Sequence, residues 1–185
     1  MSTVGRFMEL DKTIHKIAHL LVDVESANVE NAQTAQNICK LLYYTERNPL
    51  SQPDDNRISG NNPAPTFETI GDSMEYIMNK RVLLVPRVPA QTERGSFIVV
   101  ILDDFRLSEN GQFKPHTIMF DILCHHDHWL LNSSLRPYVI MQQIDDLFNN
   151  RKLSLGKLQF STGKSVVLTP TMLGYSLVYD NVTIN

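Results

Sequence analysis

The chain has few cysteines and no long apolar segment. Its 185 residues include two cysteines, Cys39 and Cys124, which lack the spacing of a disulfide framework or of a cysteine-rich metal site. The longest uninterrupted apolar run is Phe97–Leu102, whereas a transmembrane helix needs about 20 apolar residues. The first residues, MSTVGRFMELDKT, lack the apolar core of a secretory signal. We therefore expect a soluble protein with two free thiols, made inside a cell.

The chain also lacks a strong excess of charge of either sign. Its 17 Lys and Arg residues and 20 Asp and Glu residues give a net charge of −3. Bulk electrostatics therefore does not favour binding to nucleic acid or to an acidic membrane. Apolar residues make up 42% of the chain and charged residues 20%, which is typical of a globular protein. A chain of this length is expected to form one domain, residues 1–185.

Motifs of the common enzyme families are missing as well. The chain has neither a Gly-x-Ser-x-Gly nucleophile motif nor a Gly-x-Gly-x-x-Gly nucleotide motif. Ser161–Val167 contains Gly-Lys-Ser, but Leu158 stands where a phosphate-binding loop needs its first glycine. We predict a turn between two strands at Ser161–Val167. Adjacent carboxylate pairs such as Asp103–Asp104 point in different directions on regular elements. We predict that the chain is not an enzyme and has no cofactor.

Apolar residues at helical spacing predict two helices near the N-terminus. These cover about Lys12–Val24 and Val29–Thr45, and each has one apolar face. The segment Glu46–Pro65 that follows contains four prolines and many turn-forming residues. We predict a long loop or arm over residues 46–66, of the kind that becomes ordered against a neighbouring subunit. A short helix is predicted at about Asp72–Asn79.

Strand signals dominate the middle of the chain. RVLLVPRV, at residues 81–88, is one strand candidate, and Phe97–Phe105 is another. The Asn110-Gly111 pair is a strong hairpin signal, and it predicts that Phe97–Phe105 pairs with about Pro115–His125.

One further helix and two strands complete the prediction. Ser133 or Ser134 is expected to cap the helix, with Pro137 in its first turn. The strands are expected at about Leu155–Ser161 and Leu173–Tyr179. The predicted fold class is α+β. It has an antiparallel sheet of about four or five strands with a long hairpin, packed by N-terminal helices and by one helix between strands.

The stretch CHHDHW, from Cys124 to Trp129, gathers side chains that ligate metals. If the strand continues, Cys124, His126 and His128 share one face, and they would form a three-ligand zinc site with an open position. The other interpretation is that the strand ends here and that Trp129 anchors the exit by burying its ring. We favour the strand exit, because no second cysteine pair and no His-Glu-x-x-His helix accompanies the cluster, and we predict no metal.

Other charged or ligating residues have simpler interpretations. His15 and His19 are four residues apart on one helix face, where we expect solvated or boundary histidines. Arg81, Arg87 and Arg94 are scattered around the first strand and its outgoing loop. A solvated surface is the first interpretation for these arginines, and contact with phosphate or with a neighbour's carboxylates is the second.

The second half of the chain resembles the tail-terminator and tail-completion proteins of tailed bacteriophages. The resemblance covers Phe97 to Tyr179, with the hairpin FIVVILDDF…HTIMFDILCHH, the helix SLRPYVIMQQIDDLF, the segment LSLGKLQF and the final strand LGYSLVYDNV. The N-terminal stretch ICKLLYYTERNPLS is similar to segments of phage neck proteins. The loop at Glu46–Pro65 and the helix at Asp72–Asn79 are longer than the family pattern, which leaves a stopper or connector role open.

The resemblance implies a structural role at the head–tail junction of a virion. Family members form six-membered rings that end the tail tube and join it to the head connector or stopper protein, and they catalyse nothing. DNA passes through the ring without sequence readout, and no membrane is involved. The protein would be assembled in the host cytoplasm. The hairpin tip and nearby arginines would contact partners; these interface residues are Ser108, Glu109, Asn110, Gly111, Gln112, Arg87 and Arg94.

Two alternatives from other functional classes stay open. One is a small zinc-dependent hydrolase that uses Cys124, His126 and His128, with Asp103 or Asp121 as a carboxylate. The other is a monomeric adaptor that binds a peptide at a sheet edge.

Overall fold

The computed structural model describes residues 6–22, 29–52, 77, 80–84, 94–107, 113–153 and 156–182. The hairpin tip Ser108–Gln112, Arg87, most of the arm after Gln52 and all of the predicted helix at Asp72–Asn79 except Ile77 lie outside these residues. The helices are α1 (Arg6–Val22), α2 (Val29–Tyr43) and α5 (Arg136–Phe148), with 3-10 helices at Pro49–Ser51 and His126–His128. The strands are β1 (Val82–Leu83), β2 (Ser96–Leu107), β3 (Phe113–His125), β4 (Lys152–Leu153), β5 (Gly156–Val167) and β6 (Met172–Val182).

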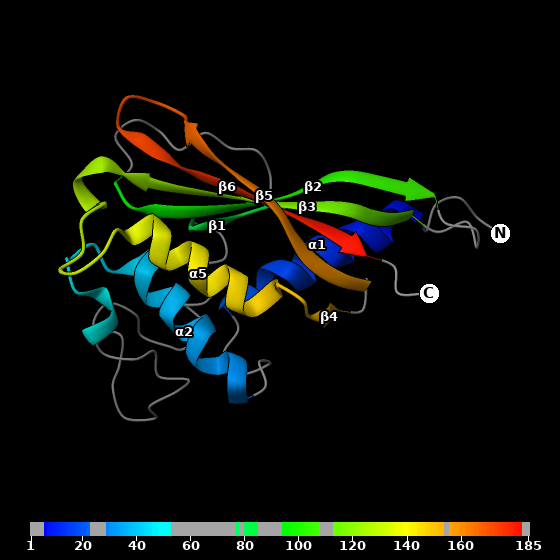
Figure 1. The fold of residues 1–185 in the computed structure, drawn as a ribbon, viewed down its shortest axis with the longest axis horizontal. Helices are drawn as coiled ribbons and strands as arrows, with labels where there is room; N and C mark the ends of the chain where they lie inside the picture. Colours follow the sequence, from blue (N-terminus) through cyan, green and yellow to red (C-terminus); the bar gives the residue numbers. More distant parts are fainter. Residues whose placement is uncertain are drawn as a thin grey trace.

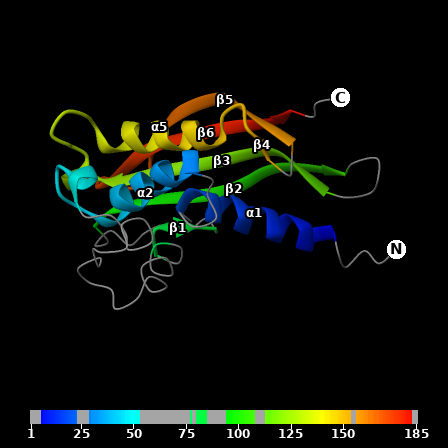
Figure 2. The same cartoon turned by 90° about the horizontal axis from the view of Figure 1, so that it is seen from below.

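The strands form one sheet in the order β1-β2-β3-β6-β5-β4. Strands β2, β3, β6 and β5 are long and pair antiparallel. The two-residue strand β1 adds to β2 in parallel, and β4 adds to the start of β5. The helices lie on one side of this sheet (Figure 1), and Figure 2 shows β5 and β1 toward its opposite edges. The predicted α+β class and the β2–β3 hairpin are confirmed.

The core lies between the helices and one face of the sheet, which we call the helix face. Cross-strand neighbours Val100, Phe120 and Leu177 belong to this core, and the ring centroids of Phe120 and Phe148 are 4.9 Å apart. The helices contribute apolar residues at helical spacing, as predicted. The buried apolar residues of α1 and α5 are Leu10, Ile17, Ala18, Leu21, Val22, Ile140, Ile144, Leu147 and Phe148.

The opposite face of the sheet carries a second, smaller cluster of buried apolar residues. It consists of Leu83, Phe97, Val99, Leu123 and Met172. The residues of β2 therefore alternate between two apolar environments, which explains why Phe97–Leu102 is apolar at every position. Among the described residues, no helix is long and apolar enough to cross a membrane.

The turn predicted at Ser161–Val167 is wrong. This segment is the second half of β5, which pairs with β6 as far as Val167 opposite Leu173. The pairing is shifted by a bulge between Phe160 and Thr162, so Thr162, Gly163 and Lys164 continue the strand. The chain reverses after it, where Leu168 N–H donates to Met172 O at 3.0 Å. The β-branched residues Val166 and Val167 favour strand conformation and outweigh the local glycine.

The predicted cap of α5 is also wrong. The helix begins at Arg136, with Leu135 at the N-cap and no side-chain cap hydrogen bond. Pro137 does lie in the first turn, where its missing N–H would have had no helical partner.

Candidate functional site

The chain leaves the sheet at the end of β3. The strand ends at His125, and His126–His128 form a 3-10 helix in which Asp127 N–H donates to His125 Nδ1 at 3.3 Å. Trp129 Nε1–H donates to Cys124 O at 3.1 Å, and its half-buried ring packs against the core. The predicted strand exit with Trp129 as its anchor is confirmed.

The alternative arrangement, a zinc face of Cys124, His126 and His128, does not form, because strand alternation stops at His125. Cys124 is fully buried, and burial raises the pKa of its thiol to about 11. Burial and the charge of Arg136 lower the pKa of His128. Asp103 is seven residues along β2 from Ser96, the partner of Cys124, and so lies roughly 23 Å away along the strand. Asp121 pairs with Val99, on the face opposite Cys124.

The side chains that do meet at this exit are His125, His126 and Asp127. Their ligand atoms all lie within 4.8 Å of one another. The Asp127 carboxylate is 3.0 Å from His126 Nε2, 3.5 Å from His125 Nδ1 and 3.8 Å from Arg94 Nη1. Nitrogen and carboxylate atoms at such distances could hold a transition metal. However, His125 Nδ1 already accepts the Asp127 N–H, so a metal there would have to displace a capping hydrogen bond.

The buried thiol makes a testable contribution to stability. The folded chain holds the Cys124 proton up to about pH 11, whereas the unfolded chain releases it near pH 9. The contribution of this protonated thiol to the free energy of unfolding is therefore fully present below pH 9. This contribution is lost as the pH rises from 9 toward 11, and the free energy of unfolding then falls by about 1.4 kcal/mol per pH unit at most. We expect urea denaturation at pH 8, 9 and 10 to show this decline, and we expect Cys124→Ala to flatten it. An unchanged pH slope in that variant would contradict the assignment.

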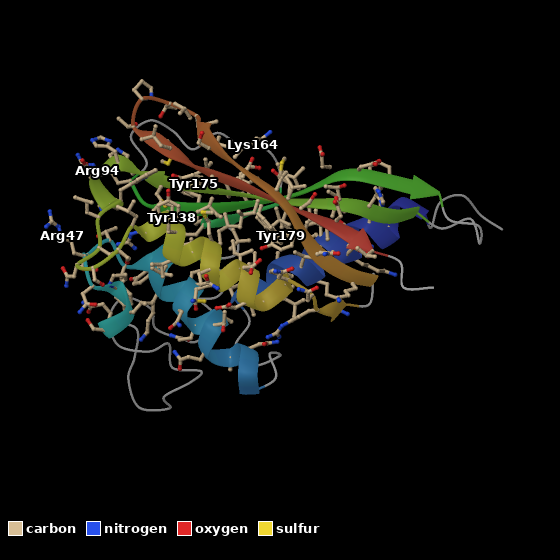
Figure 3. All side chains as sticks on the ribbon, in the orientation of Figure 1. Arg47, Arg94, Tyr138, Lys164, Tyr175 and Tyr179 are labelled. Carbon is tan, nitrogen blue, oxygen red and sulfur yellow. The ribbon has the colours of Figure 1, made fainter. Side chains whose placement is uncertain are left out.

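Strand β5 presents a second candidate site, a long exposed edge. Residues Gln159–Ser165 are exposed, and Val167 is 71% exposed. Strand β4 pairs with Gly156 and Lys157 alone, so in the part of the chain that the structure describes no strand lies along the rest of the outer edge of β5, the edge away from β6. Figure 3 shows Lys164 on this strand, on the sheet side away from α5.

An aromatic groove runs beside β5 on the helix face. It has a volume of about 360 Å³ and lies between α5 and strands β5 and β6. Tyr138 and Phe160 are exposed on it. The hydroxyl groups of Tyr138 and Tyr175 are 2.8 Å apart. Figure 3 shows these two side chains between α5 and β6. Two further lining residues are joined by a hydrogen bond, in which Tyr179 Oη donates to Asp145 Oδ1 at 2.9 Å.

The other edge of the sheet carries a groove of about 450 Å³. Its lining is apolar except for Asp11, and comes from α1, from the residue after β1 and from β2. The lining residues are Leu10, Asp11, Ile14, Leu84, Val100, Ile101, Leu102 and Phe105. Strand β1 pairs with Ile98 and Val99, and the groove begins just beyond it.

Residues 35–181 match the protein-family model named YomW. The chain belongs to the YomW family. This family is phage-derived and Bacillus prophage-like, so the chain is a phage-associated protein. The match includes the β3 exit and the full length of β5, whereas α1 precedes it. No curated protein and no solved structure is significantly similar to this YomW chain.

The structure places one of the predicted interface residues of this YomW protein. Arg94 is 70% exposed beside Asp127 at the β3 exit, whereas Arg87 and Ser108–Gln112 lie outside the described residues. The sequence analysis missed β5 as an exposed edge. A signal was present: from Gln159 to Ser165 the sequence QFSTGKS has one large apolar residue, which indicates a strand without a buried face.

Proposed function

We propose that this YomW-family chain is a structural virion protein that forms a ring at the head–tail junction. In this role it terminates the tail tube and joins it to the head connector. The phage origin of the family and the resemblance of Phe97–Tyr179 to tail-terminator proteins support the proposal. The single observation that carries it is the exposed edge of β5, because an unpaired edge is a liability in a free monomer and is covered in an assembly.

The proposed ring needs surfaces for three kinds of neighbour. Sheet edges serve contacts between copies of the chain, because main-chain groups there can pair with another strand. The hairpin tip Ser108–Gln112, together with Arg87 and Arg94, is proposed to contact the tail tube and the connector or stopper protein. The net charge of −3 suits a conduit, because a strongly basic lumen would bind the phosphates of passing DNA. Catalysis, a cofactor and a membrane have no part in this role.

The role is tested by removing the gene from a phage that encodes the chain and supplying variants in trans. Without the protein we expect filled heads and separate tails in electron micrographs, and few infectious particles. The full chain should restore joined virions. A chain without Ser108–Gln112 should fold, with an unchanged circular dichroism spectrum and melting temperature, yet restore few virions. Joined virions in the complete absence of the protein would overturn the proposed function.

Native mass spectrometry with zinc quantification separates this role from the alternatives. A closed oligomer without stoichiometric zinc supports the ring. A monomer with about one zinc per chain would favour a metal-dependent function. The structure does not support a zinc site that includes Cys124, because only His125, His126 and Asp127 bring their ligand atoms together among the described residues. A monomer that captures an extended peptide would favour the adaptor.

A further inference from the structure

We infer that the ring is closed by strand addition, in which the outer edge of β5 in one copy pairs antiparallel with the outer edge of β2, beyond β1, in the next copy. This inference rests on the proposed function and names the surface through which the copies meet. The partner is therefore a second copy of this chain, and the two surfaces are different edges of the same sheet. Such a head-to-tail contact can close into a ring.

The backbone of β5 offers hydrogen-bonding groups along its outer edge. Leu158 N–H donates to Arg151 O, and Leu158 O accepts from Asn150 N–H, both on the side away from β6. Phe160 N–H likewise donates to Asn149 Oδ1 at 3.1 Å. The β6 partners of Leu158 and Phe160 are Asn181 and Tyr179. Because pairs alternate along an antiparallel ladder, the later residues that face outward are the partners of Leu177, Tyr175 and Leu173. These are Gly163, Ser165 and Val167.

The backbone of β2 offers the matching groups. Ile98 N–H donates to Arg81 O at 2.8 Å, which shows that Ile98 faces the outer edge. By the same alternation Val100 and Leu102 face outward too. Among the described residues, β1 covers this edge at Ile98 and Val99 alone. The 450 Å³ groove lies where β1 ends, between α1 and the β2 residues Val100 to Phe105.

Strand direction favours this pairing. The four long strands alternate in direction across β2, β3, β6 and β5, so β5 runs opposite to β2. When copies are placed edge to edge in the same orientation, the β5 of one lies antiparallel to the β2 of the next. The sheet then continues from copy to copy without a break in the alternation. Within one copy, Figure 2 shows β5 and β1 toward opposite edges of the sheet.

One register satisfies the backbone, the faces and the charges together. Pairing Ser165 with Leu102 also pairs Val167 with Val100. In both pairs the two residues point their backbone N–H and C=O groups toward each other and can form hydrogen bonds. Ser165 and Leu102 both belong to the helix face, as their partners Tyr175 and Ile118 do. Val167, the last residue of β5, then lies opposite Val100, the first residue of β2 beyond those that pair with β1. Lys164 comes to the bulge that the pairing with β3 shows between Leu102 and Asp104.

Charge separates this pairing from a two-fold β5–β5 contact. The charged residues of β5 are Lys157 and Lys164, both positive, whereas the bulged segment of β2 carries Asp103 and Asp104. In the register above, Lys164 and Asp104 lie on the same face of the continued sheet, opposite the helices. Like charges brought together across a two-fold contact would oppose association, and opposite charges favour it.

The test uses edge variants of the full chain, followed by native mass spectrometry and analytical ultracentrifugation. Ser165→Pro removes an outward N–H, a change that an edge strand tolerates, and is expected to abolish the oligomer while the circular dichroism spectrum is unchanged. The matched control Ser165→Ala keeps the N–H and should assemble as the wild type does. Lys164→Glu and Asp104→Lys should each weaken self-association about tenfold, and the double variant should recover most of it.

A cysteine pair reports the register. Val166 and Ile101 form a close, non-hydrogen-bonded pair in this register, so the variant with both Val166→Cys and Ile101→Cys should oxidise into a ladder that ends at one closed oligomer. Each single variant should remain unlinked. If the wild type is oligomeric but Ser165→Pro assembles normally and the double-cysteine variant forms no ladder, the edge pairing is overturned and the proposed function stands. If the chain is monomeric and phage lacking it still join heads to tails, both are overturned.

Discussion

Replacing Gly174 with alanine is expected to destabilise the folded chain severely. Gly174 lies in β6 between Leu123 of β3 and Val166 of β5. A Cβ atom at this position would overlap the carbonyl oxygen of Ile122, and would lie 2.7 Å from Ile122 C and 3.1 Å from Leu123 Cα. These are backbone atoms of the neighbouring strand, so relief requires the β3–β6 ladder to shift. We expect a loss of about 3 kcal/mol or more.

Urea denaturation measures this loss, and Gly163 provides the matched control. A Cβ at Gly163 would lie 3.5 Å from the nearest atom, Leu177 Cδ2, which is ordinary van der Waals contact. Gly163→Ala should therefore change the free energy of unfolding by no more than about 1 kcal/mol. Equal losses in the two variants would contradict the close approach of β3 as the cause, because the added Cβ meets backbone atoms only at Gly174 within 3.5 Å.

The elements that could be predicted are those in which local signals and packing agree. The β2–β3 hairpin follows from a turn signal between two apolar strands, and it forms with Phe97 opposite Leu123. The apolar stripe of α5 is buried as predicted, from Ile140 to Phe148. In these segments each residue type favours the same structure that the tertiary contacts require.

The errors occur where a tertiary contact decides the local structure. Gly163 and Lys164 indicate a turn, but pairing with Leu177 and Ser176 of β6 holds them in a strand. The alternative zinc face of Cys124, His126 and His128 required β3 to continue past His125. Instead, His126 N–H donates to Thr171 O, and the chain forms a 3-10 helix after His125. Neither contact is visible in the sequence, because each joins segments more than ten residues apart.

Arg136 is a buried cation that sequence reasoning did not single out. It is 1% exposed. Nε donates to His128 O at 2.8 Å, Nη1 to Leu41 O at 2.8 Å and Tyr44 O at 2.7 Å, and Nη2 to Glu46 O at 2.6 Å. One guanidinium therefore joins the first turn of α5, the C-terminal end of α2 and the β3 exit. Burial lowers its pKa, and the partial negative charge at the end of α2 favours its positive form.

We expect Arg136→Met to lower the free energy of unfolding by about 3–5 kcal/mol, because it leaves four backbone carbonyls without their donor in a buried site. Arg136→Lys should recover little, since a single ammonium cannot donate in the directions that the planar guanidinium reaches. Arg94→Met is the control, because Arg94 is 70% exposed and makes a 3.8 Å ion pair; its cost should stay within about 0.5 kcal/mol. Urea denaturation gives these values, and amide exchange should show α2 near Tyr43 opening first in Arg136→Met. If that variant were as stable as Arg94→Met, water would have to satisfy the four carbonyls, and Arg136 would not be what joins α2 to the β3 exit.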